Sequence, residues 1–238
     1  MAPRSSSNGW GELRLPRSVM RIGIIGAGRI GGGIARQLAM AGHQIQLAFS
    51  RNPDTLTKLA ADIGRGVTVG EPAATVAISD VVVISVPWPV VPEALAQAGS
   101  LAGKIVIDTT NQFGVPQPPE GSTAAQFNAE RMAGARYTKS FNTLTSGFQA
   151  EAAHRVGDDR VVQWLCGDDA EAKAIVAGLI TDAGFVPVDL GEPAAAAVME
   201  APRRDGAVYG EEYRAADADA VVQAVADGKP IPPVPEYR

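Results

Sequence analysis

The sequence has 238 residues, of which 46% are hydrophobic and 20% are charged, and its formal net charge is −5 at neutral pH. This length fits one α/β domain with an appendage, and the composition allows a sizeable core. The negative charge argues against nucleic acid or an anionic membrane as a partner, because both select basic patches. No apolar run approaches the roughly 20 residues that cross a bilayer, so we expect no membrane partner.

Cysteine and histidine are too scarce for a disulfide or a zinc site. Cys166 is the single cysteine, and His43 and His154 are the only histidines, so no metal site is expected. Cys166 lies in an apolar run, which predicts a buried and inert thiol. Residues 1–19 contain no apolar stretch typical of a secretory signal, and we interpret them as a disordered extension. These features favour a cytoplasmic protein.

Strand and helix patterns alternate along the chain. The predicted strands are Arg21–Ile25, Gln44–Phe49, Val67–Val69, Asp80–Val86, Lys104–Asp108, Ala135–Ser140, Val161–Cys166 and Phe185–Val188. The predicted helices are Ile30–Met40, Thr55–Ala61 and Ala170–Ala183, with a turn at Asn52-Pro53 and helical signals after Pro89.

Unbroken apolar strands such as DVVVISV are typical of strands buried on both faces of a sheet. Their alternation with helices predicts βαβ units and a parallel sheet. The expected fold is therefore α/β, with a Rossmann-type, doubly wound, mostly parallel sheet over residues 20–190. Residues 191–238 are expected to form a small C-terminal helical appendage, with the Ala-rich stretch Pro193–Val198 and an extended tail over Lys229–Arg238.

The glycine-rich segment after the first strand is the most informative motif. It reads Gly26-Ala27-Gly28-Arg29-Ile30-Gly31, follows a strand and opens a helix, which is the context that a dinucleotide-binding loop requires. The first glycine permits the tight turn, the second lets the backbone approach a diphosphate, and the third lets helix and strand pack closely. The helix N-terminus adds unpaired N–H donors. Arg29 is a further candidate for phosphate contact, with solvent exposure as the alternative.

The end of the second strand indicates which nucleotide binds. NAD-binding proteins of this fold usually place an acidic residue there for the ribose 2′-hydroxyl. Here the strand ends in Ser50-Arg51-Asn52, which offers a hydroxyl donor and a guanidinium for a 2′-phosphate. We therefore predict NADP(H) as the cofactor, with a solvated turn as the alternative role for Arg51.

Three further segments are expected at the carboxyl ends of strands, where ligands bind in open α/β sheets. Their candidate cofactor-binding residues are Val86, Pro87, Trp88, Asn111, Phe141 and Asn142. For Trp88 the alternative is a hydrophobic lid without cofactor contact. For the two asparagines the alternative is turn formation.

Acid–base chemistry has few candidates, and the catalytic residues are left unassigned. His43 follows a helix C-terminus, where it would stabilise the helix dipole, and His154 lies in a polar, exposed segment. Lys139 is interpreted as a solvated strand-end lysine rather than an acid. A protein that positions two redox rings and moves hydride needs little proton machinery.

The ordered set MRIGIIGAGRIGGGIA, Ser50-Arg51, SVPWP, DTTN and KSFNT resembles the NADP oxidoreductases that depend on the deazaflavin coenzyme F-420. It also resembles their relatives, the cytosolic domains of membrane ferric reductases. The resemblance covers roughly Met20 to Val188. It implies that Gly26–Ile30 bind the pyrophosphate, that Ser50 and Arg51 bind the 2′-phosphate, and that Val86–Trp88 neighbour the nicotinamide.

Residues 191–238 depart from the endings of the deazaflavin enzymes. This departure leaves the electron partner open, but not the nucleotide. Arg203, Arg204 and Tyr209 are candidates for meeting an acidic substrate, with solvated charges and a packing tyrosine as the alternative.

The leading hypothesis is an NADP(H)-dependent oxidoreductase whose small-molecule co-substrate is a deazaflavin such as F-420, or a flavin. A reductase of a small imine or carbonyl is a second reading, and a non-catalytic NADP(H) sensor is a third. The resemblance also implies a homodimer, which no feature of the sequence itself demonstrates.

Overall fold

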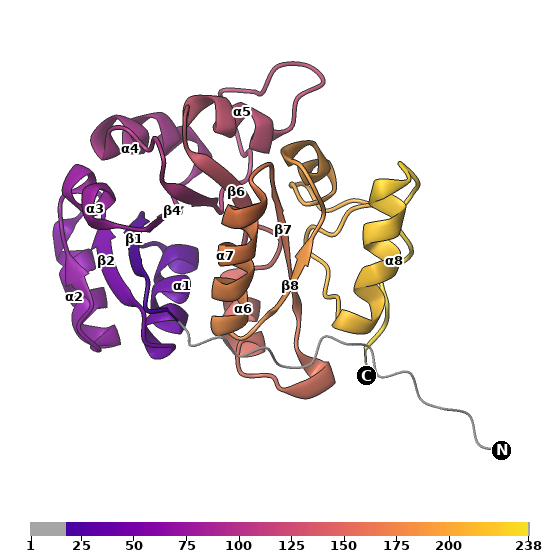
Figure 1. Ribbon diagram of the computed structural model, residues 1–238, viewed down its shortest axis with the longest axis horizontal. Coiled ribbons are helices and arrows are strands. Elements are labelled where there is room, and N and C mark those ends of the chain that lie inside the picture. Colours follow the sequence, from indigo (N-terminus) through magenta and orange to yellow (C-terminus); the bar gives the residue numbers. More distant parts are fainter. Residues whose placement is uncertain (1–17, 238) are drawn as a thin grey trace.

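One eight-stranded sheet organises the chain (Figure 1). The structure is a computed structural model that describes residues 18–237, so the predicted N-terminal extension lies outside the described residues except for its last two. The strand order is β3-β2-β1-β4-β5-β6-β7-β8, and all neighbours pair in parallel except β6 and β7. The strands are β1 (Arg21–Ile25), β2 (Gln44–Ala48), β3 (Thr68–Val69), β4 (Val81–Ile84), β5 (Ile105–Asp108), β6 (Arg136–Ser140), β7 (Val162–Gly167) and β8 (Val186–Asp189).

Helices cover both faces of this sheet. The α-helices are α1 (Arg29–Met40), α2 (Pro53–Ile63), α3 (Pro72–Ile78), α4 (Val91–Ala98), α5 (Ala124–Arg131), α6 (Ser146–Ala152), α7 (Ala170–Asp182) and α8 (Ala215–Ala226). Short 3₁₀ helices are η1 (Trp88–Val90), η2 (Gly157–Asp159) and η3 (Pro193–Val198). The Rossmann-type, mostly parallel α/β fold predicted from the sequence is confirmed. No helix within the described residues is both long and apolar enough to span a membrane.

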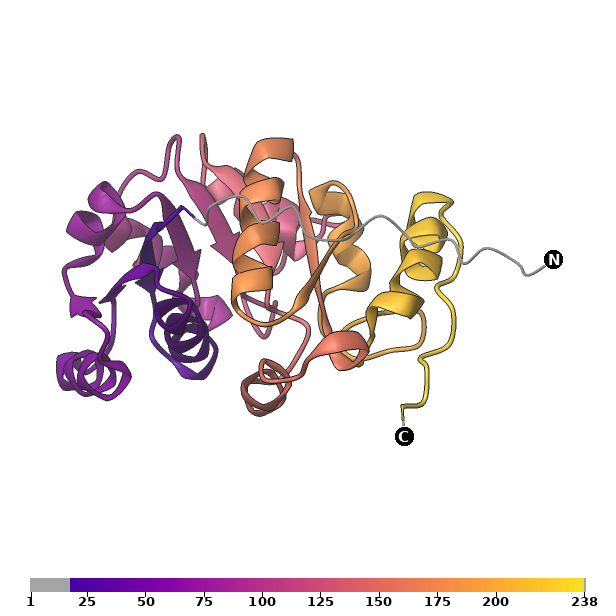
Figure 2. The same cartoon turned by 60° about the horizontal axis from the view of Figure 1, so that its bottom comes forward.

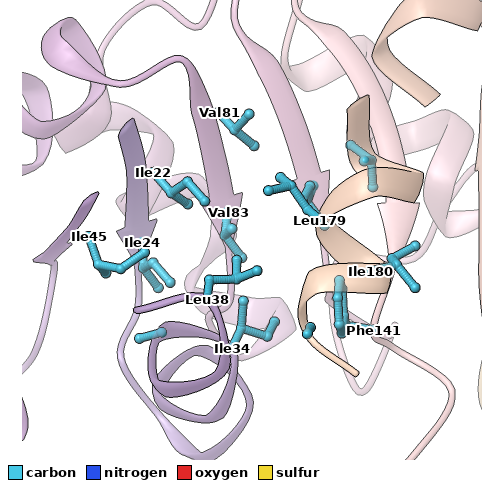
Figure 3. Packing of buried hydrophobic residues seen from close by; sticks show 14 of the residues in the cluster. Ile22, Ile24, Ile34, Leu38, Ile45, Val81, Val83, Phe141, Leu179 and Ile180 are labelled. Carbon is cyan, nitrogen blue, oxygen red and sulfur yellow. The ribbon is translucent and has the colours of Figure 1, made fainter. Parts of the chain in front are cut away.

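Two apolar cores follow from the alternation of side chains along the strands. In β4, Val81 and Val83 join the core that packs under α1, α2, α6 and α7, while Val82 and Ile84 join the core under α3, α4, α5 and α8. All four side chains are fully buried, as the unbroken apolar run predicts. Figure 3 shows the first core, with side chains of β1 and β4 meeting those of α1 and α7.

Several element boundaries differ from the sequence-based expectation. The fourth strand is shorter than Asp80–Val86, because the Asp80 carboxylate pairs with Arg21 and the chain leaves the sheet after Ile84. Helix α2 begins at Pro53 rather than Thr55, since the Asn52 side chain accepts a hydrogen bond from the Asp54 N–H and caps the helix.

Helices α3, α5 and α6 were not predicted. Each has only seven or eight residues, which is too short for a clear helical periodicity. Helix α5 nevertheless carries a local start signal, a capping box between Thr123 and Gln126.

The C-terminal residues pack against the β7–β8 side of the sheet. Helix α8 lies beyond β8 at one end of the molecule, and α2 lies at the other (Figures 1 and 2). Met199, Val208 and Tyr213 are buried in the second core, and the Val162 N–H donates to the Tyr213 carbonyl at 2.8 Å. Residues 229–237 of the tail form no helix or strand, but the Tyr237 hydroxyl donates to Asp217 at 2.6 Å and so holds this segment to α8. The division of the chain at residue 190 stays a prediction.

Two glycines of α1 give a matched test of close packing at the strand-to-helix turn. A Cβ on Gly31 would lie 2.1 Å from the Gly26 carbonyl oxygen, whereas a Cβ on Gly33 would meet nothing within 4 Å. We expect Gly31→Ala to lower the free energy of unfolding by about 2–3 kcal/mol through overpacking. Gly33→Ala should raise it by about 0.5–1 kcal/mol, because alanine favours the helix. Urea denaturation of both variants tests this, and equal shifts would contradict it.

Candidate functional site

The carboxyl ends of four parallel strands meet at one edge of the sheet. Register pairs Ile25 with Ile84, Ile84 with Asp108, and Asp108 with Lys139, so the segments that follow these strands lie side by side. The strand order changes direction between β1 and β4, which is where a doubly wound sheet forms its binding crevice. The structure therefore brings the glycine loop and the three predicted edge segments together.

The glycine loop has the backbone geometry that the motif requires. Gly26 has φ +96°, and a Cβ there would lie 2.4 Å from the Ser85 carbonyl oxygen, so this turn needs glycine. Gly28 is exposed and has open space where a Cβ would stand. The loop is thus packed tightly on its strand side and open at its second glycine.

The N-terminus of α1 offers unpaired donors. Gly28 is its N-cap and makes no side-chain cap, and the first turn contains no acidic residue. The first intrahelical bond that begins at the cap runs from the Gly32 N–H to the Gly28 carbonyl, so the N–H groups of Arg29, Ile30 and Gly31 have no partner within the helix. Ala27 and Ile30 are partly buried against the core, while Arg29 is exposed. Such an end favours an anion.

The Ser50–Asn52 segment flanks this loop, because the Gly26 N–H donates to the Ala48 carbonyl at the end of β2. The Ser50 hydroxyl donates to the Asn52 carbonyl at 2.9 Å, which shapes the turn. Arg51 is exposed, and its guanidinium makes no ion pair within residues 18–237. A free guanidinium at this position can grip a phosphate.

The segment after β4 divides between the crevice and the interior. Val86 is buried beside Gly26, and Pro87 is exposed. The Trp88 side chain is only 2% exposed, and its indole N–H donates to the Pro116 carbonyl at 2.8 Å. The Trp88 ring also packs near Phe127. The Trp88 ring is therefore a buried packing group beneath the loop that follows β5.

Asn111 and Asn142 meet directly, as expected for residues that follow neighbouring strands. The Asn111 amide donates to the Asn142 carbonyl at 2.8 Å, and the Asn142 amide donates to the Asn111 side-chain oxygen at 3.1 Å. Both also hold the C-terminal segment, because Asn142 donates to the Met199 carbonyl and Asn111 accepts from the Ala201 N–H. The Phe141 ring is fully buried in the core, and its φ of +58° places a backbone turn at this edge.

The interpretation of Lys139 as a solvated lysine is wrong. Its side chain is fully buried, and its Nζ donates to the Thr110 carbonyl at 2.6 Å. The ammonium also lies 3.7 Å from the Asp108 carboxylate and 3.9 Å from that of Glu200. A buried charge needs such partners, and they come from segments distant in sequence.

Sequence reasoning missed this buried cluster of Asp108, Lys139 and Glu200. Asp108 also accepts hydrogen bonds from Tyr137 at 2.7 Å and from Asn128 at 2.9 Å. Burial, assisted by the Asp108 charge, raises the pKa of Tyr137 well above its usual value. The signal available in the sequence was that Asp108 ends one predicted strand and Lys139 lies near the end of the next, and the structure makes the two residues register partners.

The remaining candidates lie away from the crevice or are already paired. His43 is buried, with its two ring nitrogens against Asp182 and the Met20 N–H, while His154 is exposed. Arg203 pairs with Glu211, and Arg204 donates to three backbone carbonyls of the same C-terminal segment.

Two hollows lie beside the end of β6. The smaller, of about 230 Å³, is lined by Leu144, Thr145, Phe148, Gly210 and Glu212. The larger, of about 500 Å³, shares Glu212 and is lined mainly by His154, Arg155, Val156, Asp159, Arg214 and Tyr237. Ion pairs among Arg155, Glu212 and Arg214 balance the charges around the shared wall.

With the fold and this edge defined, known proteins supply an independent comparison. Residues 21–112 match the family described as NADP oxidoreductase coenzyme F420-dependent. The metalloreductase STEAP3 of Rattus norvegicus is 31% identical over 191 residues, which cover 79% of this chain and 37% of that protein. The chain thus spans little more than a third of this curated relative.

Two solved structures share the fold of this chain. A hypothetical protein from Sinorhizobium meliloti superposes with a TM-score of 0.70 at 28% identity, covering 82% of this chain and 96% of that one. A protein of Arthrobacter sp. FB24, provisionally named an F420-dependent NADP reductase, gives 0.63 at 26% identity, covering 74% and 87%.

The fold, the glycine loop and these matches define the class as a Rossmann-type, NADP-dependent oxidoreductase. Residues 21–112 match the model of the coenzyme F420-dependent NADP oxidoreductase family, which confirms the resemblance found in the sequence. NADP(H) is confirmed as the nucleotide of this family, and the second redox partner is left open.

Charge reversal at Arg51 tests the recognition of the 2′-phosphate. We expect Arg51→Asp to weaken NADPH binding at least about tenfold and to change NADH binding little, because only NADPH carries the phosphate that the guanidinium would grip. Calorimetric titration with both nucleotides measures this. Lys58→Glu, an equal charge change at an exposed position of α2, is the control. Equal losses of NADPH and NADH affinity in Arg51→Asp would contradict the assignment.

The Cys166 thiol is expected to be unreactive in the folded protein. Burial raises its pKa to about 12 from an ordinary 9.0, so at pH 8 it holds about a thousandfold less thiolate than an ordinary thiol. Titration with a chromogenic disulfide at pH 8 should show no reaction in buffer and one thiol per chain in guanidinium chloride. Rapid labelling of the folded protein would refute the buried position.

Proposed function

We propose that this protein transfers hydride between NADP(H) and a second flat redox partner, a deazaflavin such as F-420 or a flavin. The observation that carries the proposal is a single edge of the sheet that combines unpaired N–H groups at the N-terminus of α1 with an exposed guanidinium. The open second glycine and unpaired N–H groups of α1 fit the diphosphate, and the free guanidinium of Arg51 fits the 2′-phosphate. The family match of residues 21–112 supports the same nucleotide.

Bound in this way, the nucleotide would extend its nicotinamide along the ends of β4 and β5. Val86 and the backbone of Pro87 would flank it, and Asn111 and Asn142 would hold the far side of the crevice in place. NADPH supplies the hydride when bound. The work of the chain is then to hold the donor and acceptor carbons about 3–3.5 Å apart.

The proposed reaction needs one proton, and the site does not have to supply it from a dedicated acid. Reduction of an oxidised flavin or deazaflavin by NADPH consumes one proton in addition to the hydride, and NADP⁺ is released. His43 is buried against Asp182 and His154 is exposed in a separate segment, so neither is placed as a proton donor at the crevice. Solvent at the exposed loop supplies the proton without a dedicated acid.

The decisive experiment adds candidate acceptors to the protein and NADPH and follows absorbance at about 340 nm, where reduced nicotinamide absorbs. The panel is F-420, riboflavin, a quinone, a ferric chelate, and a cyclic imine. We expect consumption of NADPH with F-420 or riboflavin. Exclusive turnover of the imine would instead identify an imine reductase, and NADPH binding without turnover across the panel would identify a sensor. The proposal also includes a homodimer and a cytoplasmic location. Light scattering tests the first, because it measures the mass of the assembly.

Gly28 offers a variant that separates folding from function. Its φ of −73° is accessible to any residue, and a Cβ there meets nothing within 4 Å, so Gly28→Val should fold with unchanged thermal stability. The added side chain stands where the diphosphate must approach, and we expect NADPH affinity to fall at least about a hundredfold. Calorimetry measures binding, and circular dichroism checks the fold. Wild-type affinity in a folded Gly28→Val protein would refute the proposed diphosphate position.

A further inference from the structure

The C-terminal segment is fastened to the crevice at three consecutive residues. The Met199 carbonyl accepts from the Asn142 amide at 2.8 Å, and the Ala201 N–H donates to the Asn111 side chain at 3.3 Å. Between them, the Glu200 carboxylate accepts from the N–H groups of Ala124 and Ala125, at 2.9 and 2.8 Å. We call Met199–Ala201 the latch.

Glu200 is the central group of the latch. It caps the first turn of α5, where a carboxylate is favoured, and it lies 3.9 Å from the buried ammonium of Lys139. Lys139 in turn holds the Thr110 carbonyl, next to Asn111. One carboxylate therefore joins the C-terminal segment to α5 and to the ends of both β5 and β6.

A second attachment places the same C-terminal region beside the smaller hollow. The Gly210 N–H donates to the Thr143 carbonyl at 2.8 Å, directly after Asn142. Gly210 and Glu212 then form one wall of the hollow, and Leu144 and Phe148 form the other. Leu144 and Phe148 belong to the same apolar core as Ala27 and Ile30 of the glycine loop.

The lining of this hollow is mostly uncharged. Its single carboxylate, on Glu212, is neutralised by Arg155 and Arg214. The charged side chains of the latch and of the residues that follow it also have partners within the protein. Glu200 accepts from N–H groups of α5, Arg203 pairs with Glu211, and Arg204 donates to backbone carbonyls. An acidic substrate would find few free cations here, whereas an uncharged ring would bury apolar surface.

We infer that the hollow between Leu144–Phe148 and Gly210–Glu212 receives the second redox substrate as an uncharged flat ring, and that Glu200 is the residue that positions its C-terminal wall. The inference rests on the proposed function and deepens it, since it assigns the site of the second substrate to the hollow beside the end of β6. Residues 191–237 would then form part of the active site instead of a separate appendage.

The test compares variants in the two walls with riboflavin as the probe, because its tricyclic ring is uncharged. Glu200→Ala releases the latch, and Phe148→Ala removes an apolar side chain from the opposite wall. We expect each to raise the KM for riboflavin at least about tenfold while the Kd for NADPH stays within about twofold of wild type. Glu200→Gln keeps one oxygen for the α5 N–H groups and should recover part of the loss.

Glu192→Gln is the matched control, because Glu192 is an exposed carboxylate of the same segment with no side-chain capping bond. It should behave as wild type. If Glu200→Ala does not fold, Phe148→Ala by itself tests whether the second substrate binds in the hollow. Wild-type KM values in the folded wall variants, with only the melting temperature lowered, would assign Glu200 a structural role and overturn the inference alone. A wild-type protein that binds NADPH but reduces no acceptor would instead overturn the proposed function, and the inference with it.

Discussion

A buried ammonium group fixes the edge of the sheet where the chemistry is expected. Lys139 has no exposed side-chain surface, and its charge is held by the Thr110 carbonyl and by the carboxylates of Asp108 and Glu200. Leaving such a charge without partners would cost several kcal/mol, because desolvation is not repaid. The end of β5, the end of β6 and the C-terminal segment therefore hold one another in place.

The two sides of this edge differ in whether their hydrogen-bonding groups already have partners. On the β5–β6 side, the paired carboxamides of Asn111 and Asn142 are consumed in fastening loops to each other. On the β1–β2 side, the N–H groups of Arg29, Ile30 and Gly31 have no partner within α1, and the guanidinium of Arg51 makes no ion pair within the described residues. Unpaired donors indicate where a ligand is expected, and paired ones show what keeps the site in shape.

Local sequence signals predicted the nucleotide half well. Gly26 has the positive φ and the close contact that the motif implies, and Gly31 leaves no room for a side chain. The carboxyl ends of β5 and β6 were also placed correctly, so the segments that carry Asn111 and Asn142 follow neighbouring strands and meet. The side chain of Trp88 turns into the interior instead, because the loop after β5 folds over it and accepts its N–H. Nothing local to Trp88 encodes that loop's path.

The short helices show the same limit. The seven residues of α3 or α6 span only about two turns, so their periodicity is too brief to recognise without the sheet against which they pack. Lys139 is the clearest case, because a lysine at the end of a strand is ordinarily solvated. Its burial depends on Glu200, whose position depends on the turn of the C-terminal segment back onto α5.

The sequence by itself determined the Rossmann topology, the glycine turn and the position of Arg51 directly after β2, because each depends on backbone conformation or residue type within a few positions. Tertiary structure alone decided that Lys139 is buried, that Trp88 packs inward, and that the C-terminal segment meets the crevice. Those outcomes arise from contacts between residues far apart in the chain, where the cost of burying a polar group is met only when all partners arrive together.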